Sequence, residues 1–245
     1  MPKNLIPLVL RTCALVAASF ADAAPEKWVA SIETFAQTDA ANPPPRHGVV
    51  FVGSSSIVKW TSLARDFPNV PTINRGFGGS ELSDSVFYAD RIVIPYQPRI
   101  VVVYAGDNDL KAGKSPETVA ADFKAFHQKI QAALPDTKIV FVGIKPSPAR
   151  WDIRNQAIQA NTLIAAECAT EPRRLAFLNI WQPMLGADGR PRPELYVADK
   201  LHLTPAGYTI WVPLAQTADR IVRPNGPGRQ IWAKNMPSRP LETAL

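Results

Sequence analysis

The chain has 245 residues, of which 46% are hydrophobic and 20% are charged, a balance typical of one globular domain with a sizeable core. Its formal net charge is +6, but lysine and arginine form no long block, which excludes a basic nucleic-acid-binding arm. The excess positive charge is expected to lie on a solvated surface, and no nucleic-acid partner is expected.

The first 23 residues have the features of a secretory signal peptide. Lys3 and Arg11 supply positive charge, an apolar stretch runs from Cys13 to Phe20, and Ala21-Asp22-Ala23 fits a cleavage site between small residues. The apolar stretch is too short to span a bilayer, so no stable membrane insertion is expected. We therefore predict a secreted or periplasmic protein that begins at Ala24. An ordinary N-terminal helix is the alternative.

Removal of the signal peptide would leave Cys168 as the only cysteine. A single cysteine excludes both an intrachain disulfide and a structural zinc site built on thiolates. Cys168 lies in an apolar helical pattern, which favours a small core residue.

Residues 24–48 are expected to form an N-terminal helix and a proline-rich lead-in, which ends in ANPPPRHG. Short apolar runs then alternate with helical patterns. The run RIVVVYAG is continuous and β-branched, as is typical of a parallel strand buried on both faces. This alternation predicts a doubly wound α/β sheet over residues 49–222, followed by a turn-rich tail at 223–245. The predicted strands are Val49–Val52, Val70–Ile73, Ile100–Tyr104, Ile139–Val142 and Leu175–Ile180.

Two of the predicted helices have clear start signals. Ser115 is placed as an N-cap with Pro116 at the first helical position, and Thr204 with Pro205 repeats that pattern. Helices between parallel strands leave a ligand crevice beyond the carboxyl ends of the strands. Function is therefore expected in the residues that directly follow each strand.

Polar or glycine-rich segments follow every predicted strand. They are GSSS at 53–56, NRGFGGS at 74–80, GDND at 106–109, GIKPSPARW at 143–151, and DKLH at 199–202 before the last helix. Each of these segments alone is most often a turn or a helix cap. Their joint occurrence, in this order and each after its own strand, is a much stronger signal.

Together these segments contain the groups that acyl transfer requires. A serine nucleophile needs a base, the base needs an orienting carboxylate, and the oxyanion needs donors in place. Of the three histidines, His47 precedes the first strand and His127 lies within a helix, so only His202 is in a loop at the correct end of the sheet. Asp199 can fold back to its ring. The glycine pair at 78–79 and Asn108 offer amide donors.

This combination resembles the SGNH, or GDSL-type, serine hydrolase family from about Val49 to Val222. By that resemblance Gly53-Ser54-Ser55 is the first block, and the nucleophile is Ser55. Ser54 stands where the family usually has aspartate. That position is not one of the family's four catalytic residues, which are serine, glycine, asparagine and histidine. The remaining blocks place an oxyanion donor on Gly79, a second on Asn108, and the acid and base on Asp199 and His202. The backbone amide of Ser55 would be a third donor.

The resemblance implies a flavodoxin-like three-layer α/β/α sandwich with a mostly parallel five-stranded sheet. It also implies hydrolysis of a carboxylic ester without metal or cofactor. The expected partner is a small-molecule, glycan or lipid ester. Since no long apolar lid segment is evident, short acyl or acetyl esters are favoured. Two alternatives stay open: a non-catalytic module that binds acylated glycans or lipids, and an acyltransferase that uses the same triad.

Three other motifs are weaker. AGKS at 112–115 lacks a glycine required of a phosphate-binding P-loop, which also needs a helix entered directly from Lys114, whereas Pro116 marks a later start. GFGG has Glu81 where a dinucleotide fingerprint needs its last glycine, and GDND lacks calcium-loop spacing.

The loop at 143–151 has two interpretations. Its side chains could contact a leaving group, but a rigid connector is favoured. The side chains concerned are Lys145, Ser147, Arg150 and Trp151.

Overall fold

The structure is a computed structural model that describes residues 25–221. The predicted signal peptide and C-terminal tail lie outside these residues. The five strands form one all-parallel sheet in the order β2-β1-β3-β4-β5, which is the flavodoxin-like strand order. The expected fold class is confirmed. The strands are β1 (Val49–Gly53), β2 (Thr72–Gly76), β3 (Ile100–Tyr104), β4 (Lys138–Val142) and β5 (Leu175–Leu178).

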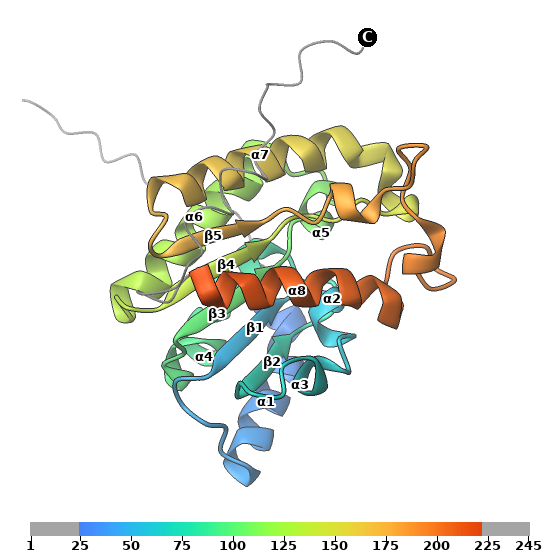
Figure 1. The fold of residues 1–245 in the computed structure, drawn as a ribbon. Helices are drawn as coiled ribbons and strands as arrows, with labels where there is room; N and C mark the ends of the chain where they lie inside the picture. The colour runs from blue at the N-terminus through green and yellow to red at the C-terminus, as the bar shows by residue number, and fades with distance from the viewer. Residues whose placement is uncertain (1–24, 222–245) are drawn as a thin grey trace, which may run out of the picture.

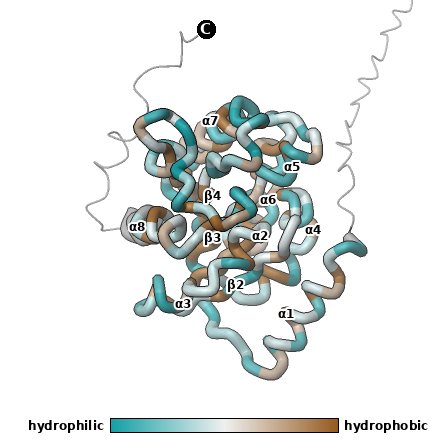
Figure 2. The backbone as a smooth tube through the Cα atoms, turned by 90° about the vertical axis from the view of Figure 1, so that its right-hand side faces the viewer, coloured by the Kyte–Doolittle hydropathy of each residue, from teal (hydrophilic) through white to brown (hydrophobic). Residues whose placement is uncertain are grey.

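Helices cover both faces of the sheet. One face carries α1 (Val29–Ala41), α4 (Leu82–Ile92), α6 (Pro116–Ala133) and α7 (Arg154–Thr170). The other carries α2 (Ser55–Val58), α3 (Leu63–Asp66) and α8 (Pro205–Ile221), and α8 crosses it in front of the strands (Figure 1). From the side, α3 and α8 lie on one side of the strands and α4 and α6 on the other (Figure 2). No helix within residues 25–221 is long and apolar enough for a membrane crossing.

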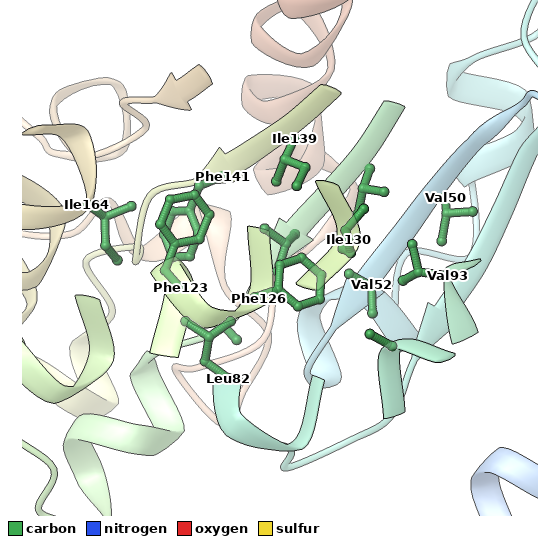
Figure 3. Close-up of a cluster of buried hydrophobic side chains, with 14 of the residues drawn as sticks. Val50, Val52, Leu82, Val93, Phe123, Phe126, Ile130, Ile139, Phe141 and Ile164 are labelled. Atoms are coloured by element: carbon green, nitrogen blue, oxygen red, sulfur yellow. The ribbon is translucent and has the colours of Figure 1, made fainter. Parts of the chain in front are cut away.

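Alternation along the strands divides the buried side chains into two cores. Val50 and Val52 of β1 point to the α4–α6–α7 side, whereas Val49 and Phe51 point to the α8 side. Figure 3 shows the first core, in which strand valines and isoleucines lie among Phe123, Phe126 and other side chains of α6. Because both faces are covered, the strands are nearly continuous in hydrophobic residues, as the sequence indicates.

The second strand lies further along the chain than predicted. The sequence favoured Val70–Ile73, but β2 spans Thr72–Gly76. Pro71 has no N–H to give to a ladder, and its carbonyl instead accepts from the Val49 amide at 2.8 Å. The strand therefore starts after the proline and includes residues that we expected in a loop. The fifth strand is shorter than predicted and ends at Leu178.

The helix start signals have visible counterparts. The Ser115 side chain accepts a hydrogen bond from the Thr118 amide at 3.2 Å, the contact expected of an N-cap. Thr204 accepts from the amide of Gly207 at 3.3 Å, directly before the start of α8. The remaining short helices are α5 (Asp107–Lys111) and 3-10 turns; the turn η3 (Pro148–Ile153) precedes α7, and η1 (Pro25–Trp28) precedes α1.

Candidate active site

Ser55 is presented by a sharp turn at the end of β1. Gly53 has a φ of +131°, and a Cβ there would lie 1.9 Å from the carbonyl oxygen of Tyr104, so only glycine fits. The amide of Ser54 donates to that same carbonyl at 3.0 Å. Ser55 is then the first residue of the short helix α2, at the carboxyl edge of the sheet. Its side chain is half-buried, whereas both neighbouring serines are buried.

His202 lies in the loop before α8, and its ring contacts both Ser55 and Asp199. Nε2 is 2.8 Å from Ser55 Oγ, and Nδ1 is 2.6 Å from Asp199 Oδ2. A carboxylate only accepts, so Nδ1 carries a proton and Nε2 is left to accept from the serine hydroxyl. This arrangement can deprotonate a hydroxyl nucleophile.

The Asp199 carboxylate is held by its own loop. Its Oδ1 accepts from the backbone amides of Leu201 and His202, each at 2.9 Å. Burial raises the pKa of Asp199, but hydrogen bonds from the His202 ring and from these two amides outweigh it and hold the pKa below its usual value. The carboxylate therefore stays charged beside the imidazole near neutral pH.

The loop after β2 lies against Ser55. The Phe77 amide donates to the Gly53 carbonyl at 2.8 Å, and a Cβ at Gly78 would lie 3.8 Å from the Ser55 Cβ. Gly79 follows with a φ of +81°, a conformation that side-chain-bearing residues rarely adopt. Both glycines are exposed, so their backbone is accessible beside the hydroxyl.

Asn108 reaches the same loop from α5. Its Nδ2 donates to the carbonyl of Ser80 at 2.9 Å, and its Oδ1 accepts from Arg150 at 2.8 Å. The structure thus brings all five predicted site residues to one edge of the sheet: Ser55, Gly79, Asn108, Asp199 and His202.

A buried polar cluster that the sequence patterns did not indicate lies beside this site. Lys145 is only 3% exposed, and its Nζ lies 3.1 Å from Asp107 Oδ2, 2.8 Å from the Tyr104 hydroxyl and 3.2 Å from Ser56 Oγ. Burial raises the pKa of Asp107, but the charges of Lys145 and Arg150 outweigh it and lower that pKa. The connector interpretation of the loop at 143–151 is therefore incomplete. A lysine beyond a buried strand was the available signal.

The other two histidines lie away from the triad. His47 is exposed before β1, and its ring contacts the carbonyl of Gln97 at 3.1 Å. His127 is buried within α6 and lies 3.0 Å from Glu167 Oε1. Lys114 of the AGKS segment pairs with Glu81 at 3.0 Å, rather than lying free at a helix start. Within residues 25–221, no three histidine, cysteine, aspartate or glutamate side chains are grouped as metal ligands.

Known proteins resemble this chain in both sequence and fold. The sequence model of the GDSL-like Lipase/Acylhydrolase family matches residues 47–210. No curated protein matches the chain significantly.

Several solved structures share the fold. A proposed acylhydrolase from Bacteroides fragilis is 23% identical, with a TM-score of 0.69 over 80% of this chain and 99% of that one. A GDSL-like lipase from Bacteroides thetaiotaomicron is also 23% identical, with a TM-score of 0.65 over 77% and 97%. A catalytic mutant of an acetylxylan esterase from Geobacillus stearothermophilus is 13% identical, with a TM-score of 0.55 over 70% and 93%.

Proposed function

Because the chain belongs to the GDSL-like lipase/acylhydrolase family, we propose that it is a secreted or periplasmic serine esterase that hydrolyses short acyl or acetyl esters. The observation that carries the proposal is the continuous contact from Ser55 Oγ through the His202 ring to Asp199, at 2.8 Å and 2.6 Å. These are hydrogen-bonding distances within which a base can take the proton of a nucleophile.

In the proposed reaction, His202 takes the proton of Ser55 as its oxygen attacks the ester carbonyl. The negatively charged carbonyl oxygen is bound by the amides of Ser55 and Gly79 and by the side chain of Asn108. His202 then protonates the departing alcohol and leaves an acyl-serine. A water deprotonated by His202 attacks this ester, which releases the acid and restores Ser55. Asp199 stabilises the imidazolium in both halves.

Three observations support short acyl groups on a bulky alcohol. Asp199 is 46% exposed at the side chain and Gly78 and Gly79 are exposed, so the site is open to large substrates such as glycans. A structure of similar fold is described as an acetylxylan esterase, which acts on such a substrate class. Within residues 25–221, the segments around the triad include no long apolar lid.

The first prediction tests this function with Ser55→Ala. Hydrolysis of p-nitrophenyl esters graded by chain length, and of acetylated sugars, is measured for wild type and variant. Activity is expected to be highest for acetyl esters and to fall by at least about 10⁴-fold in Ser55→Ala, because the nucleophile is lost.

Ser54→Ala is the matched control, because Ser54 is adjacent but lies outside the triad. It should keep most of the activity. A fluorophosphonate probe should label wild type at Ser55 and ignore a protein that only binds esters. Wild-type activity in Ser55→Ala, with loss in Ser54→Ala, would show that the nucleophile is assigned wrongly. Formation of acyl-acceptor products in place of free acid would indicate a transferase.

A further inference from the structure

Arg150 makes a two-pronged contact with the residues that follow β3. It lies within the turn η3, where its own φ of −128° and ψ of 28° depart from helical values. One end of the guanidinium donates to the backbone carbonyl of Asp107, and the other donates to Asn108 Oδ1 at 2.8 Å. Both acceptors belong to the first turn of α5, which carries the proposed oxyanion donor. The contact spans more than 40 residues of sequence.

These contacts determine which way the Asn108 amide faces. A side-chain amide has one acceptor oxygen and two N–H donors, and a flip about its last bond exchanges them. Arginine has only donors, so the amide oxygen must face Arg150. The nitrogen then faces the loop at 76–80, where one N–H is used by the Ser80 carbonyl at 2.9 Å. No acceptor among the described residues takes the second N–H, which is left for a ligand.

We propose that Arg150 is a positioning residue, a role that rests on the proposed function. It holds the Asn108 amide so that this second N–H is directed at the oxyanion of the attacked ester. It acts through Asn108 and does not itself touch the reacting atoms. A charged donor on the amide oxygen also polarises the amide, which strengthens the opposite N–H as a donor. The fork of a guanidinium suits two acceptors at fixed separation, a geometry that lysine does not reproduce.

The neighbouring Arg154 provides a matched control. It also carries a guanidinium beside the site loop and donates to the Trp151 carbonyl at 3.2 Å. Its charge lies over the Trp151 ring, 5.5 Å from the centroid. Loss of Arg154 thus removes a nearby positive charge and similar packing, but none of the contacts to Asn108.

A double-mutant cycle tests the proposal with p-nitrophenyl acetate. The enzymes are wild type, Arg150→Met, Asn108→Ala, the double variant and Arg154→Met. Arg150→Met should lower kcat about 10-fold and change KM less than about 2-fold, since it misorients a donor whose complete loss costs about 10²–10³. In the Asn108→Ala background the same substitution should change kcat less than about 2-fold. The kcat of Arg154→Met should stay within about 2-fold of the wild-type kcat.

Several outcomes overturn the proposal. They are an equal loss in both backgrounds, a raised KM at unchanged kcat, or wild-type kcat in Arg150→Met. If Arg150→Met does not fold, Arg150→Lys takes its place in the cycle, with an expected loss of about 3-fold that again vanishes without Asn108.

A second readout is independent of turnover. The side-chain amide signals of Asn108 in a proton–nitrogen NMR spectrum should move in Arg150→Met and stay in place in Arg154→Met. Unmoved signals overturn the positioning role even if the protein is an active esterase. Conversely, a wild type that cleaves no ester refutes the proposed function, whereas the NMR comparison still decides the role of Arg150.

Discussion

Three consecutive polar residues after β3 have three different environments. Asp107 is buried against Lys145, Asn108 is half-buried at the site edge, and Asp109 is fully buried. Burial raises the pKa of Asp109 to about 6, although the Leu82 amide and the charge of Lys114 act in the opposite direction. Ionisation of Asp109 is therefore less favourable in the folded protein than in the unfolded chain.

A pH dependence of stability follows from Asp109. Its pKa is about 6 when folded and 3.8 ordinarily, so the folded state binds the proton more tightly. The raised pKa lowers the free energy of unfolding. This destabilisation is fully present above pH 6 and is relieved as the pH falls from 6 towards 3.8. Relative to Asp109→Asn, wild type should gain about 1 kcal/mol of unfolding free energy between pH 7 and pH 5. Urea unfolding of both proteins at the two pH values measures this, and parallel changes would contradict it.

Single residues of the candidate site were predictable where few candidates existed. His202 is the one histidine of three that follows a strand, and Asp199 is at a spacing that lets it fold back. Arg150 was not predictable in the same way. Its contact to Asn108 spans 42 residues, and basic side chains in a proline-rich loop are equally compatible with a connector.

At the level of elements, the short helix α2 and the ends of β3 and β4 are joined by one buried ammonium. Lys145 follows β4, Ser56 belongs to α2, and Tyr104 ends β3. The partner carboxylate of Asp107 has one oxygen that is buried and has no hydrogen-bond partner among the described residues. The charge of that carboxylate is compensated first by Lys145 and second by Arg150.

Lys145→Met should therefore destabilise the protein strongly. Loss of one member of a buried ion pair typically costs about 3–5 kcal/mol, because the remaining charge stays buried without its direct partner. The double variant Lys145→Met/Asp107→Asn removes that charge and should recover a large part of the loss. Chemical denaturation of the three proteins at pH 7 measures both effects. A double variant as unstable as Lys145→Met would show that packing, rather than charge, sets the cost.

Strand positions were predictable to different degrees for a physical reason. The hydrophobic run of β3 is unambiguous because both faces of that strand are buried. β2 is an edge strand, with a burial pattern that includes half-exposed residues, so its composition does not mark its ends. Its middle residue is Asn74, whose side chain donates to the Ile57 carbonyl at 2.7 Å and so connects β2 to α2.

At the scale of the whole molecule, the N-terminal helix is part of the site's support. The family match begins at residue 47, yet the segment before it packs on matched residues. Trp28 contacts the Phe77 ring edge-on at 5.6 Å and lies 3.4 Å from the position of a Cβ on Gly79. Asp39 of α1 pairs with the buried Arg75. The helix was expected, but its place against the loop at 76–80 depends on tertiary packing that sequence does not encode locally.

Two truncations separate the proposed export segment from this support. A chain without residues 1–23 should keep wild-type Tm and activity, because the proposed signal peptide is removed on export. Mass spectrometry of the exported protein should show that it begins at Ala24. A chain without residues 1–41 also loses Trp28 and Ile32, which are 8% and 1% exposed. Loss of one large buried aromatic costs about 3–5 kcal/mol, and each kcal/mol lowers the Tm of a chain this long by about 2–4 °C.

The longer truncation should thus lower Tm by about 10 °C or more in a thermal scan, and it should reduce kcat because the Gly79 loop loses its cover. Trp28→Ala in the full chain is the matched point variant and should show part of both effects. If removal of residues 1–41 left Tm and kcat unchanged, α1 would be an appendage and the loop at 76–80 would hold its conformation through the contacts with Gly53 and Asn108 alone.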